Sequence, residues 1–231
     1  MELYFGNKNY SSWSLRPWLL MKHFDIPFTE HMVSVAGRGA HEMHRPYSKN
    51  GLVPCLHIEN DFQIWDTLAI AEYLAETYPE KNLYPVDRLA RARARSISAE
   101  MHSGFGQVRS AMGMNIKMRL KGVAQGAKVS PEVASEIARI IEIWRDAREE
   151  FGKATGKPYL FGEFSIADAM FAPVVWRFFS YNVPLEGEAK AYLDTMLAHP
   201  SMLEWEQSAL AETVALAHYD DAVLASYGGA R

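Results

Sequence analysis

Residues 51–74 read GLVPCLHIENDFQIWDTLAIAEYL, and their pattern decides the fold. Two short apolar segments, 53–59 and 62–65, flank the pair Asn60-Asp61. Asn and Asp tolerate the backbone of a tight turn, so this pair between two apolar segments is typical of a β-hairpin. The stretch therefore predicts two adjacent antiparallel strands.

A helix is expected directly after the hairpin. Asp66 and Thr67 carry side-chain oxygens that can accept from the first backbone N–H groups of a helix. The apolar residues that follow recur at helical spacing and predict a helix over 67–77: Leu68, Ile70, Ala71 and Leu74.

Upstream of this stretch, strand and helix patterns alternate. Residues 2–6 have the pattern of a buried strand, residues 27–35 have the pattern of a second strand, and an apolar helical face lies between them. Proline is tolerated only in the first turn of a helix, so Pro17 predicts that this helix begins near Ser14. The order β-α-β-loop-β-β-α predicts an α/β domain with a four-stranded mixed sheet.

Downstream, the pattern becomes entirely helical. Apolar residues that step by three or four predict one long helix through 97–112 and another through 133–151. Ser165 and Asp168 form a capping-box pattern at the start of a further helix, in which each can satisfy the other's backbone N–H.

Shorter helices near 188–198 and 201–217 complete an all-α region. The amino-acid composition changes at residues 78–85, YPEKNLYP, which contain two prolines and few apolar side chains. We therefore expect a first domain at 1–80, a linker at 81–87 and an all-α domain at 88–231.

The composition excludes several functional classes. The 231 residues carry a formal net charge of −4, which argues against a surface for nucleic acid. The single cysteine, Cys55, excludes an internal disulfide, a CxxC redox pair and a multi-cysteine zinc site. No apolar run approaches about 18 residues, and no secretory signal is visible. We expect a cytoplasmic protein that binds no metal, nucleic acid or membrane.

Three segments of the first half could carry chemistry. The first is YSSWSLR at 10–16, where we expect Ser11 and Ser12 in the loop before a helix. A helix N-terminus offers unpaired N–H groups and partial positive charge, which stabilise a thiolate, and a serine hydroxyl can donate a hydrogen bond to it. The alternative is that these serines only cap the helix.

The second segment is Val53-Pro54, and the third is Asp66-Thr67. A cis bond before Pro54 would turn the backbone of Val53 outward, where it could pair with a peptide; an ordinary trans proline is the alternative. At the helix start, the Thr67 hydroxyl and the helix amides could hold a carboxylate while Asp66 holds an ammonium group. The alternative there is a simple N-cap.

In this order and spacing, the three segments resemble the glutathione-binding domain of the cytosolic glutathione transferase family. The resemblance covers essentially the whole chain. It implies a thioredoxin-like N-terminal domain, an all-α C-terminal domain, and a role for Ser165 and Asp168 as the family's C-terminal capping box. The SSWS turn is most similar to the serine-type classes, and nearest to the zeta class and its bacterial relatives.

The resemblance also implies a function and an assembly. The expected protein is a cytoplasmic homodimer with a role in detoxification. It would conjugate its co-substrate glutathione to a small hydrophobic electrophile. Ser11 takes the position of the hydroxyl that stabilises the glutathione thiolate, and Ser12 is the second catalytic candidate.

Other family roles carry over where residues match. Val53 matches the residue that pairs with the cysteinyl backbone of glutathione, before the cis Pro54. Asp66 and Thr67 match the pair that holds the γ-glutamyl end. The glycyl carboxylate has no assigned partner, and the candidates are His41, His44 and Arg45.

The electrophile is expected beside the first turn. Its pocket candidates come from that turn and from the helix at 97–112: Tyr10, Trp13, Met101, Phe105, Arg109 and Met112. The methionines and the phenylalanine would equally suit the core of a helix bundle. Two departures argue against the isomerase activity of the zeta class, since Trp13 replaces its cysteine and Ser180 stands in place of its arginine.

Two alternatives stay open. The same thiolate could serve a glutathione-dependent isomerase or peroxidase. The chain could also be a non-catalytic protein of the same fold that binds glutathione or another ligand. Leu52 supports this last alternative, because related proteins often carry at that position a polar residue that contacts glutathione.

Overall fold

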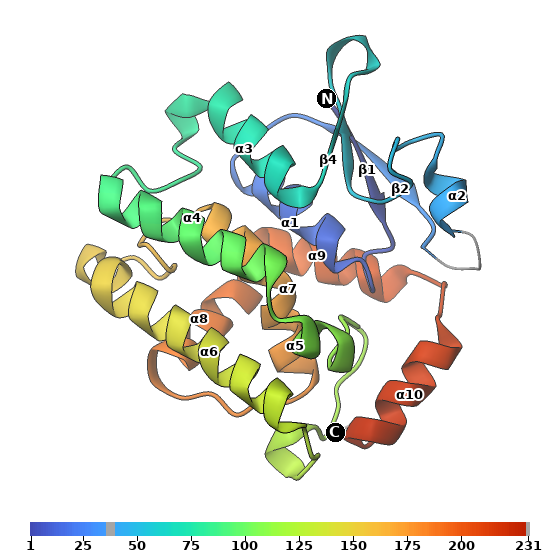
Figure 1. Cartoon of the computed structure of the whole chain (residues 1–231), viewed down its shortest axis with the longest axis vertical. Coiled ribbons are helices and arrows are strands. Elements are labelled where there is room, and N and C mark those ends of the chain that lie inside the picture. The colour runs from blue at the N-terminus through green and yellow to red at the C-terminus, as the bar shows by residue number, and fades with distance from the viewer. Residues whose placement is uncertain (36–39, 230–231) are drawn as a thin grey trace.

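The computed structural model describes residues 1–35 and 40–229, with their side chains except those of Ala40, His41, His218 and Tyr219. Figure 1 shows two regions side by side, a small sheet with its helices and a larger group of helices. The predicted α/β domain followed by an all-α domain is confirmed.

Within the described residues the sheet contains four strands: β1 (Glu2–Gly6), β2 (Thr29–Val33), β3 (Cys55–His57) and β4 (Gln63–Trp65). Their spatial order is β2-β1-β3-β4. Strand β1 runs parallel to β2 and antiparallel to β3, and β3 runs antiparallel to β4. The predicted mixed sheet is therefore confirmed, with the hairpin at one of its edges.

The third strand is shorter than predicted. It starts at Cys55, because Pro54 has no N–H to donate to a strand ladder, and it ends before a 3₁₀ turn at Glu59–Asp61. The Val53-Pro54 peptide bond is cis. Cys55 is fully buried, and burial raises the pKa of its thiol.

Helix α1 (Ser12–His23) begins two residues before the predicted start at Ser14. The expectation that Ser12 lies in the preceding loop is therefore wrong. Pro17 lies inside the helix, so the carbonyl of Trp13 lacks its usual N–H partner four residues later. The hydroxyl of Thr67, the first residue of α3 (Thr67–Thr77), donates to that carbonyl at 3.2 Å. A contact from another helix thus replaces the bond that Pro17 removes.

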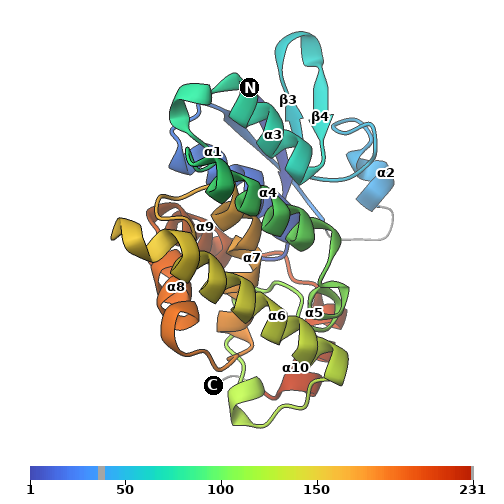
Figure 2. The ribbon, with the colours of Figure 1, turned by 60° about the vertical axis from the view of Figure 1, so that its left-hand side comes forward.

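Helices α1 and α3 lie on the side of the sheet that faces the second domain, and the short α2 (Ala40–His44) lies on the other side (Figures 1 and 2). Helix α3 ends at Thr77, and the next helix, α4 (Arg88–Ser103), opens the helical region. These limits support the proposed division into 1–80, 81–87 and 88–231.

The second domain is built around α7 (Ile166–Ser180), which is buried along almost its whole length. Its predicted capping box is confirmed: the Asp168 carboxylate accepts from the N–H of Ser165 at 2.8 Å and from its hydroxyl at 3.0 Å. Burial raises the pKa of Asp168 to about 6. Helices α4 and α8 (Gly187–Leu197) pack on α7, and α6 (Pro131–Ala147) packs on α8.

The single helix predicted through 97–112 is wrong. Helix α4 ends at Ser103, Phe105 adopts φ 55°, and α5 (Gly106–Ala111) follows. Near the start of α5 the Glu136 carboxylate of α6 accepts the N–H of Val108 at 2.7 Å. Helices α8 and α9 (Pro200–Ala211) correspond to predicted ones, whereas α10 (Ala217–Tyr227) was not predicted. Only Val223 and Tyr227 are buried among its described side chains, so no long apolar stripe marks this helix.

The two domains share a pair of imidazoles, of which His199 is buried and His23 is half-buried. His23 Nδ1 of α1 lies 2.7 Å from Nε2 of His199, which precedes α9. The Nδ1 atom of His199 accepts the N–H of Ser201 at 3.1 Å, so the proton of the neutral ring lies on Nε2 and is donated to His23. The His23 ring also stacks on Phe164, with 4.1 Å between ring centroids.

Candidate active site

The N-terminus of α1 carries a short chain of polar groups. Ser11 is the N-cap residue, and its Oγ lies 2.7 Å from the Oγ of Ser14. The Ser14 hydroxyl also accepts the backbone N–H of Gly6 at 3.0 Å. Ser11 thus lies at the positive end of a helix, with a hydroxyl partner that strand β1 holds in place.

Ser11 lies close to β1 because residue 6 is glycine. A Cβ atom at Gly6 would lie 2.5 Å from Cγ1 of Val35 and 2.9 Å from Oγ of Ser11. Neither distance is compatible with ordinary packing, so any side chain at position 6 would displace both neighbours. The sequence did not mark Gly6, since a glycine at the end of a strand has several structural explanations.

Ser12 meets a residue that the sequence did not identify. Its buried hydroxyl accepts from Nη2 of Arg177 at 3.3 Å, and Nε of Arg177 donates to the carbonyl of Met112 at 2.8 Å. Arg177 lies on α7, and it reaches the site because α7 packs directly on α1. Ser180, at the position of the zeta-class arginine, is fully buried and donates to the carbonyl of Asn115 instead.

A cavity of about 580 Å³ opens beside these serines. Five predicted residues line it: Tyr10, Ser11, Ser12, Trp13 and Arg109. Five further residues that line it were not predicted: Val35, Gly113, Met114, Arg177 and Leu216.

Three predicted pocket residues do not line this cavity. Met101 and Met112 are 0% exposed and Phe105 is 7% exposed, and all three belong to the hydrophobic core. These three side chains therefore lie in the core of the helix bundle, which was the alternative interpretation of this apolar stripe. The break at Phe105 reorients the chain after α4, and Met114, two residues after the predicted helix through 97–112, lines the cavity instead.

Trp13 forms one wall of the cavity and lies among cations. The guanidinium carbon of Arg16 lies 4.3 Å from a ring centroid of Trp13, and that of Arg109 lies 5.4 Å away. The His102 ring meets the indole edge-on at 5.4 Å. Indole is the best aromatic partner for a cation, so these contacts hold the ring in place.

The start of α3 lies next to this turn, outside the cavity lining. Asp66 caps α3 by accepting the N–H of Leu68 at 2.8 Å, and its Oδ1 lies 3.4 Å from Nε2 of His102. Because the Thr67 hydroxyl donates to Trp13, its proton is already used within the protein. The outer edge of this region carries the half-buried Val53 and the exposed Leu52.

The candidates for the glycyl carboxylate lie around α2. The side chain of His41 is outside the described residues. His44 is buried, and its Nε2 lies 2.8 Å from the carbonyl oxygen of Ser34. Arg45 donates to the carbonyl of Lys49 at 2.8 Å.

The C-terminal segment holds the loop between β1 and α1. The Glu212 carboxylate accepts the N–H of Lys8 at 2.6 Å and that of Asn9 at 3.3 Å. The Tyr10 hydroxyl donates to Asp220 of α10 at 2.9 Å and accepts the N–H of Leu216 at 3.1 Å. Burial raises the pKa of Tyr10, and its hydroxyl is directed to α10 rather than to Ser11.

Two family models match this chain. The model of the glutathione S-transferase N-terminal domain matches residues 10–77, and that of the C-terminal domain matches residues 127–208. The chain belongs to the glutathione S-transferase family. The expectation of a glutathione-dependent enzyme with this two-domain fold is confirmed.

Relatives in the family include isomerases. The chain is 26% identical over 175 residues to a probable maleylacetoacetate isomerase of Caenorhabditis elegans, covering 75% of this chain and 77% of that protein. It is 23% identical over 206 residues to the maleylacetoacetate isomerase of Pseudomonas aeruginosa, covering 87% and 93%. A glutathione transferase homolog from Burkholderia, solved with bound glutathione, superimposes with a TM-score of 0.66 at 21% identity and covers 91% of this chain and 98% of that one.

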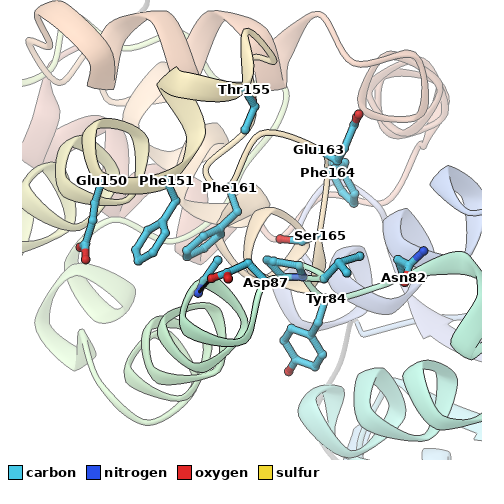
Figure 3. Close-up of a pocket in the computed structure, with 13 residues that line it drawn as sticks. Asn82, Tyr84, Asp87, Glu150, Phe151, Thr155, Phe161, Glu163, Phe164 and Ser165 are labelled. Atoms are coloured by element: carbon cyan, nitrogen blue, oxygen red, sulfur yellow. Dashed lines mark hydrogen bonds between the residues drawn. The ribbon is translucent and has the colours of Figure 1, made fainter.

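This family member has a second cavity, of about 490 Å³, far from Ser11. Figure 3 shows it between the start of α4 and the segment that precedes α7. Its walls are aromatic, with Phe151, Phe161 and Phe164 on one side and Tyr84 on the other. Three carboxylates lie around it, from Asp87, Glu150 and Glu163.

Two searches of the described residues gave negative results. No three His, Cys, Asp or Glu side chains in that part of the chain converge as metal ligands. No helix there is long and apolar enough to cross a membrane.

Proposed function

We propose that this protein stabilises glutathione as a thiolate at Ser11 and conjugates it to an electrophile in the adjacent cavity. The observation that carries the proposal is the chain of Ser11, Ser14 and Gly6 at the N-terminus of α1, which opens on that cavity. Ser11 donates to Ser14 Oγ, which also accepts the Gly6 N–H. In the proposal both hydroxyls rotate when the thiolate binds, so that Ser14 donates to Ser11 Oγ. The Ser11 proton is then available to a sulfur in the cavity, and the dipole of α1 favours the anion further.

Glutathione would lie across the N-terminal domain. The backbone of Val53, before cis Pro54, is proposed to pair with its cysteinyl residue. Asp66 would hold the ammonium group, and the first amides of α3 would hold the γ-glutamyl carboxylate. Thr67 contributes through the backbone in this proposal, because its hydroxyl donates to Trp13. His41 stays a proposed partner of the glycyl carboxylate.

The reaction is a nucleophilic substitution or addition. The thiol proton is released to solvent, the sulfur forms a bond to the electrophilic carbon, and any leaving group departs with its electron pair. Conjugation is favoured over isomerisation, since Trp13 replaces the zeta-class cysteine and Ser180 is buried against Asn115. Tyr10, Trp13 and Arg109 are the proposed electrophile-binding residues of the sequence that line the cavity.

The decisive experiment measures the thiol pKa of bound glutathione by ultraviolet absorbance of the thiolate. In the wild-type protein this pKa should lie well below that of free glutathione. In Ser11→Ala it should rise by about 1–2 units, and turnover should fall on the order of 10²-fold with little change in glutathione affinity. Ser96→Ala, an exposed serine of α4, is the matched control.

The other outcomes separate the alternatives. A normal thiol pKa in the wild-type protein despite saturable binding would favour the non-catalytic binding protein. A depressed pKa with turnover of organic hydroperoxides or cis-enedione acids, and none of a chloronitrobenzene, would favour the peroxidase or the isomerase. We also propose a cytoplasmic homodimer, as is typical of the family, and light scattering during gel filtration measures its mass.

A further inference from the structure

The active-site cavity is rich in positive charge. Among the described residues that line it, two carry guanidinium groups, Arg109 and Arg177, and none carries a carboxylate. A third guanidinium, of Arg16, lies directly behind Trp13. Arg16 is 1% exposed, and its Nη1 and Nη2 atoms have no hydrogen-bond partner within the described part of the chain. Burial, and then the charges of Arg177 and Arg109, lower the pKa of Arg16 well below its usual range.

The nearby carboxylates are occupied by other groups. Asp66 accepts from Leu68 and lies against His102. Asp220 accepts from the Tyr10 hydroxyl at 2.9 Å and from Nδ2 of Asn115 at 2.7 Å. Among the described residues neither acid forms an ion pair with Arg109 or Arg16, although the charge of Asp66 acts on Arg16 and partly offsets the shift of its pKa.

Arg109 is the cation best placed to meet a ligand. It lies on α5, is half-buried and lines the cavity. Its Nη1 donates to the carbonyl of His102 at 3.2 Å, a neutral oxygen, and no carboxylate of the described residues forms an ion pair with it. A partly desolvated guanidinium that faces an apolar wall is costly unless an anion pairs with it.

The anion that Arg109 would bind is not part of glutathione in the proposed arrangement. The residues proposed to hold the glutathione backbone, Val53, Asp66 and Thr67, do not line this cavity. Arg109 comes from the second domain and lines the same cavity as Ser11. The other walls are apolar and suit the body of a planar molecule: Trp13, Val35, Met114 and Leu216.

We infer that the electrophile is a planar carboxylate, with Arg109 binding its anionic end and the reacting carbon facing Ser11. This inference rests on the proposed function and makes its second substrate more specific. The carboxylate is unchanged by the reaction: the glutathione sulfur bonds to the electrophilic carbon, and a halide leaves with its electron pair. Arg177, which donates to Ser12, adds positive charge at the inner end of the cavity.

The test uses two electrophiles that carry either a carboxylate or a neutral carboxamide at one position. These are 4-chloro-3,5-dinitrobenzoate and the corresponding neutral benzamide, which release chloride from the same carbon. Each kcat/KM is divided by the rate constant of the uncatalysed reaction with glutathione, because a carboxamide activates the ring more strongly than a carboxylate. The wild-type protein should show a lower KM for the benzoate, with kcat/KM higher by about 10–10²-fold. Arg109→Gln should remove this preference by lowering kcat/KM more for the benzoate than for the benzamide, whereas Arg109→Lys should retain part of it.

A control variant and salt dependence sharpen the test. Arg145→Gln removes an exposed arginine of α6 that pairs with Asp146, and it should retain the preference for the benzoate. Added salt should reduce the preference in the wild-type protein. Equal kcat/KM for the two electrophiles in the wild-type protein, or equal losses for both in Arg109→Gln, would overturn the inference while transferase activity stands.

A binding experiment distinguishes this failure from failure of the proposed function. S-(4-carboxybenzyl)glutathione should bind more tightly than S-benzylglutathione by calorimetry, and only while Arg109 is present. If neither chlorinated electrophile reacts but this difference persists, the transferase proposal fails and the carboxylate site stands. If the two conjugates bind equally, the carboxylate site is wrong.

Discussion

Two cavities of this protein, the candidate active-site cavity and the distal cavity of Figure 3, have similar volumes, about 580 Å³ and 490 Å³, and opposite electrostatic character. The candidate active-site cavity carries guanidinium groups, whereas the distal cavity carries carboxylates. Each distal carboxylate has a partner: Asp87 caps α4, Glu150 pairs with Arg93 at 2.9 Å, and Glu163 pairs with Lys157 at 3.3 Å.

A cavity is therefore not by itself evidence of a functional site. The distal cavity is the gap that remains where aromatic rings meet a linker, and its charges are already paired within the described residues. The active-site cavity combines a helix N-terminus, a serine pair and a guanidinium that forms no ion pair within the described residues. Three perturbations test the contrast between the two cavities.

The largest effect is expected from Phe161→Ala in the distal cavity. Phe161 is 7% exposed and packs on Phe151, with 5.5 Å between ring centroids. Loss of the ring should lower the free energy of unfolding by about 3–5 kcal/mol, measured by urea unfolding. Turnover of the folded protein should not change, because no described residue lines both this cavity and the cavity at the serines. A lower kcat at a temperature where the variant is fully folded would contradict this assignment.

Gly6→Ala should have a smaller effect on stability, and it should also affect the activity of the candidate site. The new methyl group would overlap Val35 and displace Ser11, so stability should fall by about 1–3 kcal/mol and the thiol pKa of bound glutathione should rise. Gly106→Ala is the matched control, because a Cβ at that helical position meets nothing within 4 Å. That substitution should raise stability by about 0.5–1 kcal/mol and leave the thiol pKa unchanged. An unchanged thiol pKa in Gly6→Ala would show that the position of Ser11 is not limiting.

The smallest effect concerns the imidazole pair, whose His23 ring stacks on Phe164 of the distal cavity. Burial, and then the neighbouring His23, lower the pKa of His199 from 6.5 to about 4, and burial lowers that of His23 while Asp25 and Glu163 oppose the shift. Both pKa values are lower in the folded protein, so the pair's contribution is complete above pH 6.5 and is lost as the pH falls towards 4. The Tm should therefore drop by a few degrees over this interval.

The variant His199→Asn tests the origin of that pH dependence. Asn can still accept the N–H of Ser201 at the start of α9, but it does not titrate. Its Tm should vary less with pH between 6.5 and 4 than that of the wild-type protein. An identical pH profile in the variant would assign the acid sensitivity to other groups.

Local signals predicted much of the fold. Asp66 starts α3, Ser165 and Asp168 form the capping box, and the hairpin lies where residues 51–74 place it. Each of these features depends on side chains within a few residues of one another. The start of α1 was wrong for the opposite reason, since the group that compensates for Pro17 is Thr67 on another helix.

In the candidate site, too, local features could be predicted and contacts between distant residues could not. Tyr10, Ser11 and Trp13 line the cavity as predicted, because all three belong to one turn. Arg177 was missed, since its contact with Ser12 joins residues 165 positions apart. Met101 and Met112 were placed in the pocket because helical periodicity identifies a buried face without showing whether that face borders the core or a cavity.

The hydrogen bond from Thr67 to Trp13 has an evolutionary consequence. The hydroxyl at position 67 is needed because position 17 is proline, so the two positions are epistatic although they lie in different helices. A lineage that replaced Pro17 would give the Trp13 carbonyl a backbone donor and release the Thr67 hydroxyl for glutathione. Among relatives, the residues at these two positions should therefore change together, and the same threonine would serve the fold in one branch and the ligand in another.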